Sequence, residues 1–377
     1  MSTEENKATF RRYVEKVTNQ GNLELADEIF DRYLAHQPDG SVLERGPEDV
    51  ERFMGEFHYA FPDFHATIEE QIAEGDKVVS RWRIRGTHEG EFRGMAPTGE
   101  QAEINGIGIF RFSPEGKVIE SWDSYDQLNL MRQSIEQELR MARRIQQALL
   151  PQTIPQPDGW ELTAYYQPAR EVGGDFYDFL ELEDGRLGLV VGDATGHGVP
   201  AALVMANTQS VLRAVAQRGG SAPSRALEEA NEVLYTYIPP SMFVTCFYAI
   251  LDPKSGGLRY ANAGHNLPCS RRHDGQADEL RARGMPLGLM PGMGYEEKET
   301  VLEAGQSVLF YSDGLIEAHD PTGEMFGSHR LRSLLAEHPR VGKELTAYLV
   351  EELERFTGER WEQEDDITLV TLRRSTF

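Results

Sequence analysis

Cysteine and long apolar segments are both scarce in this chain. Its 377 residues contain two cysteines, Cys246 and Cys269, without a metal-type spacing. We therefore expect no disulfide framework and a reducing, cytoplasmic environment. No segment approaches the ~18 apolar residues of a membrane-spanning helix, and no apolar segment follows a basic N-terminus, so no membrane partner is expected.

Positive charge is the second shortage. The chain has 38 Lys and Arg against 62 Asp and Glu, which gives a net charge of −24. Such a surface repels nucleic acid, so no nucleic-acid partner is expected. A phosphorylated substrate is still compatible, because bound divalent cations reverse the local sign of charge. A Cys-x₅-Arg phosphatase loop is excluded, since Asp252 and Gly275 stand where its arginine would follow the two cysteines.

What the chain does have is aspartate at the ends of apolar segments. Asp175 begins one such segment and Asp193 ends another, with a turn predicted at 183–185 between them. Asp313 follows a third apolar segment and Asp365 precedes a fourth. A single Gly-Asp pair is ordinary turn punctuation. Four acidic strand ends on one rim instead predict a site for hard divalent cations, because crowded carboxylates otherwise repel each other.

Six motifs occur in one order from about residue 139 to the C-terminus. They are Gly-Gly-Asp-Phe-Tyr-Asp (173–178), Gly-Asp-Ala-Thr-Gly-His-Gly (192–198), Asn-Ala-Gly-His-Asn (262–266), Pro-Leu-Gly-Leu (286–289), Ser-Asp-Gly (312–314) and Asp-Asp-Ile-Thr (365–368). As a set they resemble the metal-dependent serine/threonine phosphatases of the PPM type, in particular the SpoIIE/RsbU group related to protein phosphatase 2C.

That resemblance implies a β-sandwich flanked by helices and two Mn²⁺ or Mg²⁺ ions. By motif match, Asp193 would bridge both ions and the carbonyl of Ala194 would bind one of them. Asp313 and Asp365 would complete the other ion's site, and Asp175 would act through the first ion and its waters. The implied substrate is phosphoserine or phosphothreonine on a signalling protein, most simply a STAS-domain anti-sigma-factor antagonist.

The N-terminal third reads as helices followed by strands. Helical periodicity covers 6–35 and 47–60, and strands are predicted at 63–73, 76–86, 102–113 and 116–123. This order favours an α+β cone with an internal pocket. Segments at 58–63, 86–90, 96–99 and 120–126 resemble the SnoaL-like polyketide cyclases, a branch of the nuclear transport factor 2-like fold, over residues 5–132.

This second resemblance implies a pocket for a small apolar ligand. Asp126 matches the position of the cyclases' acid/base, and His36, His58 and His88 are candidate pocket residues. Each histidine could equally have a purely structural role. Because the cone fold is widely reused for binding, both a sensor and a working cyclase stay open for this domain.

A helix is predicted to join the halves. Apolar residues follow steps of three and four at Leu128, Met131, Ile135, Ala142, Ile145 and Leu149. The helix either packs on its own domain or forms a coiled coil in a homodimer. Residues 139–151 resemble the regulatory dimer helix before RsbU-type phosphatase domains, which favours the homodimer.

The whole sequence therefore predicts an α+β protein of three parts: a sensor domain (1–127), a linker helix (128–151) and a phosphatase domain (152–377). The favoured function is a phosphatase controlled by the sensor. The alternatives are a catalytically weak signalling scaffold and a small-molecule cyclase with an appended phosphatase domain.

Overall fold

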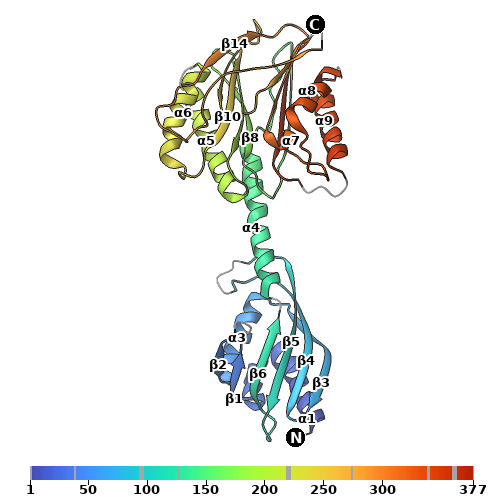
Figure 1. Cartoon of the computed structure of the whole chain (residues 1–377). Helices are drawn as coiled ribbons and strands as arrows, with labels where there is room; N and C mark the ends of the chain where they lie inside the picture. Colours follow the sequence, from blue (N-terminus) through green and yellow to red (C-terminus); the bar gives the residue numbers. More distant parts are fainter. Residues whose placement is uncertain are drawn as a thin grey trace. The chain divides into compact units, whose positions relative to one another are not determined.

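Two units, residues 1–138 and 139–377, make up the chain in a computed structural model (Figure 1). The structure describes residues 2–37, 40–92, 97–125, 127–217, 222–272, 275–337, 340–358 and 363–376. Within these ranges, none of the helices has both the length and the apolar character needed to cross a membrane.

The first unit is a six-stranded sheet with helices packed against it. The strands, in the order β2-β1-β6-β5-β4-β3, are β2 (Val42–Arg45), β1 (Phe30–His36), β6 (Val118–Tyr125), β5 (Gln101–Phe112), β4 (Lys77–Thr87) and β3 (His65–Glu74). The helical segments are α1 (Thr3–Arg12), a π-helix (Tyr13–Asn19), a 3₁₀ turn (Leu23–Leu25), α2 (Ala26–Ile29) and α3 (Pro47–Ala60). The predicted strands at β3 to β6 and the helix at α3 are confirmed.

The second of the helices predicted within 6–35 is wrong beyond residue 29. Residues 30–36 form β1, which pairs with β6 in parallel and with β2 in antiparallel fashion. Helical spacing at Ala26, Ile29 and Phe30 suggested that the second helix continued, but pairing with a strand some 90 residues later is invisible to local periodicity. Backbone hydrogen bonds to β6 and β2 therefore determine the conformation of this segment.

The second unit is a sandwich of two five-stranded sheets, as predicted. The first sheet comprises β14 (Glu297–Val301), β11 (Gly257–Ala263), β10 (Val244–Leu251), β9 (Leu187–Ala194) and β8 (Asp175–Glu181). The second comprises β13 (Ala277–Glu279), β12 (Cys269–Arg271), β15 (Ser307–Tyr311), β16 (Ile367–Arg374) and β7 (Trp160–Gln167). The strand β13 lies inside the stretch 271–283, although the Arg, Asp and Gly residues of this stretch are typical of a loop.

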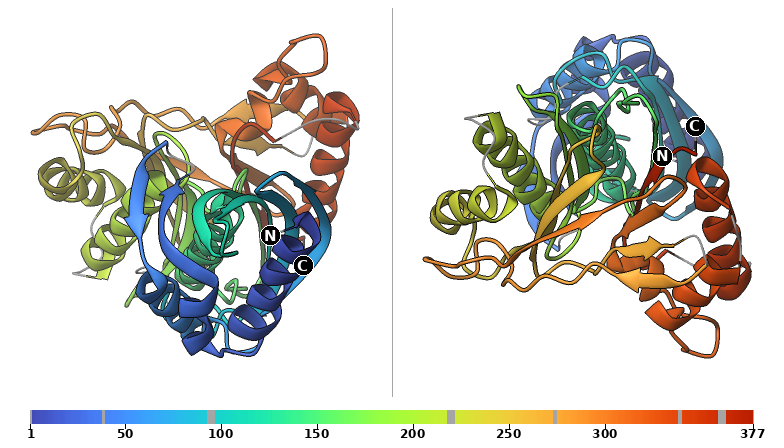
Figure 2. Two further views of the ribbon diagram at one scale, coloured as in Figure 1. Left: turned by 90° about the horizontal axis from the view of Figure 1, so that it is seen from below. Right: turned by 90° about the horizontal axis from the view of Figure 1, so that it is seen from above.

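Helices cover the outer face of each sheet in this unit. The helices are α5 (Val199–Gln217), α6 (Pro223–Tyr237), α7 (Asp313–Ile316), α8 (Gly327–Glu337) and α9 (Gly342–Thr357). Figures 1 and 2 show α5 and α6 on one side of the sandwich, with α8 and α9 on the other. Because both faces of the central strands are covered, these strands are largely apolar, and all five residues of β15 are buried.

The helix α4 (Gln127–Leu149) carries the predicted apolar stripe. Pro151, which lacks a backbone N–H, stands just beyond its end. Ile135, Met141 and Ile145 on this helix are 56%, 55% and 60% exposed. The side chains of Leu128 and Met131 lie outside the described residues.

Candidate functional site

The hairpin β8–β9 brings the first two aspartates together. The predicted turn is present, with the N–H of Gly185 donating to the carbonyl of Leu182. In the resulting register Asp175 lies directly opposite Asp193. Neighbouring carboxylates on paired strands repel each other, so this arrangement needs compensation from its surroundings.

The other two predicted aspartates approach the same place from the second sheet. Asp313 begins α7 immediately after β15, and Asp365 lies just before β16, which is the neighbour of β15. Burial, followed by the charges of Asp313 and Asp365, raises the pKa of Asp193 to about 8. The structure therefore brings Asp175, Asp193, Asp313 and Asp365 into one acidic cluster, as the four strand ends suggested.

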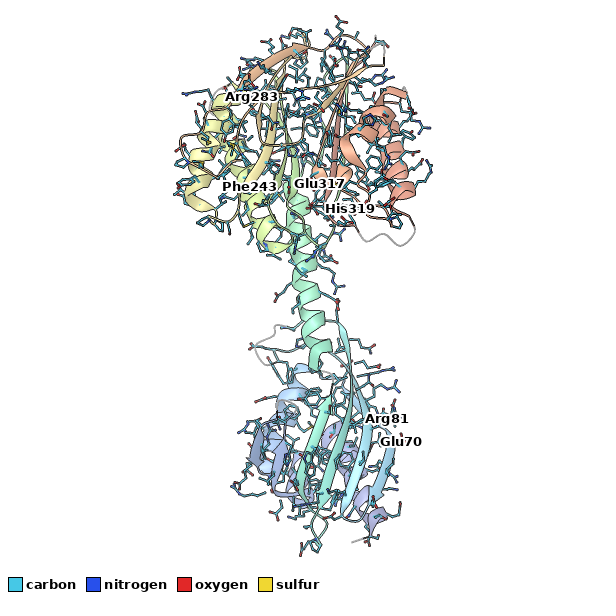
Figure 3. The ribbon with its side chains drawn as sticks, in the orientation of Figure 1. Glu70, Arg81, Phe243, Arg283, Glu317 and His319 are labelled. Carbon is cyan, nitrogen blue, oxygen red and sulfur yellow. The ribbon has the colours of Figure 1, made fainter. Side chains whose placement is uncertain are left out.

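A fifth acidic residue near this cluster was not predicted. Glu317, at the end of α7, raises the pKa of Asp193, and after burial it is the largest cause of the raised pKa of Asp313 (Figure 3). His319, two residues later, has its Nδ1 2.8 Å from a carboxylate oxygen of Glu364. The exposed His197 acts in the opposite direction, since its charge lowers the pKa of Asp365.

Asp175 lies deepest in the cluster, with 1% of its surface exposed. Its Oδ2 accepts a hydrogen bond of 2.6 Å from the hydroxyl of Thr368 on β16. Burial, followed by the charges of Asp193 and Asp366, raises its pKa well above the ordinary range. Thr368 thus connects the first aspartate of one sheet to the second sheet.

Asp366 organises the backbone that precedes β8. Its carboxylate accepts hydrogen bonds from the N–H groups of Ala169 (2.8 Å), Gly174 (2.6 Å) and Asp175 (3.3 Å). Asp366 is adjacent to Asp365 in the chain, and no role was predicted for it. Its only sequence signal is the Asp-Asp doublet before β16, which does not distinguish a ligand from a backbone acceptor.

The loop after Asp193 is held to the neighbouring strand. The hydroxyl and N–H of Thr195 donate to the carbonyl of Phe243, whose own N–H donates to that hydroxyl. Gly196 and Gly198 then take positive φ angles of 90° and 73°, which side chains disfavour, before α5 begins. The motif 192–198 is therefore a strand end, an anchored turn and a helix start.

His265 has a structural position in the second unit. It is buried, and its Nδ1 lies 2.8 Å from the hydroxyl of Thr245 on β10. Burial lowers its pKa to about 4, so the imidazole is neutral at physiological pH. The side-chain amide of Asn262 also bonds the His265 backbone in both directions, which shapes the turn of the motif 262–266.

The donor set of the acidic cluster suits hard divalent cations. All predicted ligands offer oxygen, and Oδ1 of Asp313 is buried without a hydrogen-bond partner among the described residues. The carbonyl oxygen of Ala194 and Oδ1 of Asp193 both lie beside Gly174. A Cβ added to this glycine would be 2.6 Å from the first oxygen and 3.2 Å from the second, so the two oxygens border the same small space. Among the described residues, no group of three Asp, Glu, Cys or His side chains is already arranged to hold a metal ion. The residues fit the ions in chemistry, because carboxylate and carbonyl oxygens are the ligands that such ions prefer.

Comparison with known proteins identifies the family. A family model described as Stage II sporulation protein E (SpoIIE) matches residues 183–375, just over half of the 377 residues. The chain belongs to the SpoIIE family. A second model, described as SnoaL-like polyketide cyclase, matches residues 8–134. The first unit thus has a SnoaL-like fold and the second is a SpoIIE-type phosphatase domain, as the two resemblances predicted.

Individual relatives agree with this assignment. Protein IcfG of Synechocystis is 31% identical over an alignment of 265 residues, and the match covers 63% of this chain and 42% of IcfG. Phosphoserine phosphatase RsbU of Bacillus subtilis is 28% identical over 256 residues, 67% of this chain and 75% of RsbU. The SiaA-PP2C domain of Pseudomonas aeruginosa superimposes with a TM-score of 0.59 at 25% identity, over 66% of this chain and 99% of that domain. The chain therefore spans less than half of IcfG and three quarters of RsbU.

The SnoaL-like unit of this SpoIIE family member contains a cavity of about 190 Å³. Its walls are mostly aromatic and aliphatic, and its polar lining includes Arg45, Ser121 and Asp123. Burial raises the pKa of Asp123 to about 6, an effect that the charge of Arg45 partly offsets. An apolar cavity with a few polar groups is typical of small-molecule sites.

The predicted pocket histidines do not line this cavity. Nε2 of His36 lies 2.9 Å from a carboxylate oxygen of Glu120, and its ring stacks on Trp122. The ring of His58 packs against Phe64, and the buried ring of His88 stacks on another phenylalanine. Their contacts are those of structural histidines. Asp126 lies outside the described residues, whereas Asp123 and Tyr125 line the cavity from β6.

Proposed function

We propose that this chain is a metal-dependent protein phosphatase that hydrolyses phosphoserine or phosphothreonine on a signalling protein. The observation that carries the proposal is that Asp175, Asp193, Asp313 and Asp365, from distant segments, lie in one acidic cluster in which neighbouring carboxylates raise one another's pKa. An uncompensated cluster of this kind is unfavourable, so its presence favours a cation-binding role. The similarity to RsbU, which is named a phosphoserine phosphatase, supports the reaction class.

Two Mn²⁺ or Mg²⁺ ions would be held by Asp193, the carbonyl of Ala194, Asp313 and Asp365, with Asp175 acting on the first ion. When bound, such ions supply an activated water and neutralise charge on the phosphoryl group. Without cations the cluster would repel a phosphate dianion, so cation binding and substrate binding are expected to be linked.

The protein's own contribution is to hold this donor set. Asp193 is placed by the last residues of β9 and by the anchored turn at Thr195. Asp175 is oriented by the hydroxyl of Thr368, and its backbone by the carboxylate of Asp366. These contacts come from both sheets, so the sandwich keeps the carboxylates in position before any ligand arrives.

The metal requirement is the direct test. The full chain is assayed with p-nitrophenyl phosphate and with a serine-phosphorylated STAS-domain protein, after chelation and after adding back Mn²⁺ or Mg²⁺. We expect hydrolysis to disappear with the chelator, to return with either ion, and to be absent in Asp313→Asn. Asp278→Asn, which changes a half-exposed aspartate on β13, is the control and is expected to stay active. Undiminished hydrolysis in excess chelator would contradict the proposal.

The remaining proposals concern regulation. We propose that residues 1–127 form a sensor domain for a small apolar ligand, residues 128–151 a dimerising linker and residues 152–377 the phosphatase domain. The cavity supports ligand binding, and the exposed apolar residues of α4 support a homodimer. An anti-sigma-factor antagonist is the protein substrate we expect. A cyclase remains the second candidate function for the first unit, because Asp123 supplies a buried carboxyl inside an apolar cavity.

A further inference from the structure

The last turn of α4 contacts the Gly-Gly-Asp motif directly. Gln146, which is 5% exposed, donates from Nε2 to the carbonyl of Gly173 at 2.6 Å. Its Oε1 accepts the N–H of Gly173 at 3.1 Å. One side-chain amide thus satisfies both backbone groups of one glycine, and a buried polar group of this kind is costly to leave unpaired.

The same backbone is held from the opposite side by Asp366. Its carboxylate accepts the N–H groups of Gly174 and Asp175, and it occupies the space that a Cβ on Gly173 would need. The N–H of Gly173 therefore donates to a side chain of α4. The N–H groups of Gly174 and Asp175 both donate to Asp366, which lies just before β16. The position of Asp175 follows from both attachments.

Further contacts connect the end of α4, through α5, to the strand β8. The carbonyl of Leu149 accepts hydrogen bonds from Nε2 of Gln209 (3.1 Å) and from Nη2 of Arg213 (3.3 Å), both on α5. Arg213 also forms an ion pair with the buried Asp178 of β8, three residues after Asp175. A displacement of the α4 terminus would therefore disturb hydrogen bonds at both Gly173 and Asp178.

We propose that Gln146 is a positioning residue that couples the end of α4 to the placement of Asp175, and thereby sets the affinity of the acidic cluster for divalent cations. This inference rests on the proposed phosphatase function and deepens it. It names the contact through which a change in the linker helix would reach the site. Gln146 itself touches neither substrate nor ion, so its effect is transmitted through the backbone of Gly173.

The test compares two neighbouring glutamines in the full chain. Gln146→Met keeps the length of the side chain and removes both hydrogen bonds, while Gln147→Met makes the same change at an exposed position. Mn²⁺ affinity is measured by calorimetry, and kcat and KM for p-nitrophenyl phosphate are measured across Mn²⁺ concentrations. We expect Gln146→Met to weaken Mn²⁺ binding about 10- to 100-fold. Its kcat at saturating Mn²⁺ should change much less, and Gln147→Met should match wild type.

Two further variants separate positioning from general stability. Gln146→Glu retains the acceptor for the Gly173 N–H and loses the donor, so an intermediate Mn²⁺ affinity is expected. Leu335→Ala truncates a buried residue of α8, over the other sheet, and should lower the melting temperature without changing Mn²⁺ affinity. Wild-type Mn²⁺ affinity in a folded Gln146→Met, or an equal loss in Leu335→Ala, would overturn the proposal. If the wild-type chain neither binds Mn²⁺ nor hydrolyses the ester, the proposed function itself fails.

Discussion

At the scale of single residues, the acidic cluster divides into carboxylates that face the candidate site and one that holds the backbone. Asp193 and Asp313 have pKa values raised first by burial and then by neighbouring acidic groups. Asp366, although it is adjacent to Asp365, accepts three backbone hydrogen bonds. Two neighbouring residues of the same type therefore have different expected phenotypes.

Asp193→Asn is expected to abolish hydrolysis while leaving the fold intact. The activity should fall by more than about 100-fold, because even residues that only orient metal ligands cost 10- to 100-fold when changed. Removing one like charge should also raise the melting temperature of the chelator-treated protein. Turnover at the wild-type level in Asp193→Asn, with folding checked by circular dichroism, would contradict the two-metal assignment.

Asp366→Ala is expected to act mainly on stability. Three N–H groups would lose a charged acceptor, and hydrogen bonds to charged groups contribute about 1.5–3 kcal/mol each, so the free energy of unfolding should fall by at least ~2 kcal/mol. Asp365→Ala is the matched variant, because among the described residues this exposed side chain accepts a hydrogen bond only from the N–H of Asp366. It should lose activity and keep its stability in urea denaturation. Equal stability losses in the two variants would refute the distinction.

At the scale of elements, α4 contains both exposed apolar residues and a buried polar contact. Ile145 is 60% exposed, while the adjacent Gln146 is buried against Gly173. One face of the helix end is therefore packed within the second unit, and the apolar stripe lies elsewhere on its surface. Burial of Ile145 needs another surface, which a second copy of the chain would supply.

Ile145→Glu is expected to convert a dimer into monomers. In a coiled-coil seam the substitution would bury an unpaired charge, which costs several kcal/mol, whereas at an exposed position its effect is within ~0.5 kcal/mol. Sedimentation analysis of the full chain measures the monomer–dimer balance. Gln147→Glu, a change to the same residue at an exposed position two residues later, is the control. An unchanged balance in Ile145→Glu would leave the helix without a dimer role.

At the scale of the whole molecule, the SnoaL-like unit and the SpoIIE domain share one continuous helical segment. The helix α4 begins at Gln127, two residues after the cavity residue Tyr125, and ends at Leu149, whose carbonyl is bound by α5. Control by a ligand requires that the ligand bind two arrangements of the chain with different affinity. The continuity of the helix makes such control physically reasonable.

A cavity ligand is therefore expected to change the phosphatase rate without being consumed. An apolar compound identified by thermal shift on the full chain should alter this rate by roughly 5- to 150-fold, which corresponds to a coupling of ~1–3 kcal/mol. Asp123→Asn should weaken its binding, and Asp31→Asn, at an exposed position of the same unit, should not. If the compound is chemically converted while the phosphatase rate stays constant, the first unit is a cyclase.

The sequence alone determined those features that depend on neighbouring residues. The β8–β9 hairpin with Asp175 and Asp193, the strands of the sandwich and the helices α3 and α4 follow from local periodicity and turn residues. The acidic strand ends were visible because each lies beside its own strand. The four predicted aspartates were therefore visible in the sequence, whereas the contributions of Asp366 and Glu317 were not.

Tertiary structure decided what depends on residues distant in the chain. Three such contacts join segments 27 to 197 residues apart. They are the pairing of β1 with β6, the hydrogen bonds from backbone N–H groups to Asp366, and the contact of Gln146 with Gly173. Likewise, Asp123 lines the cavity in the first unit, whereas the rings of the three predicted histidines pack on neighbouring side chains. Such contacts depend on how the elements pack, and periodicity along the chain carries no information about that packing.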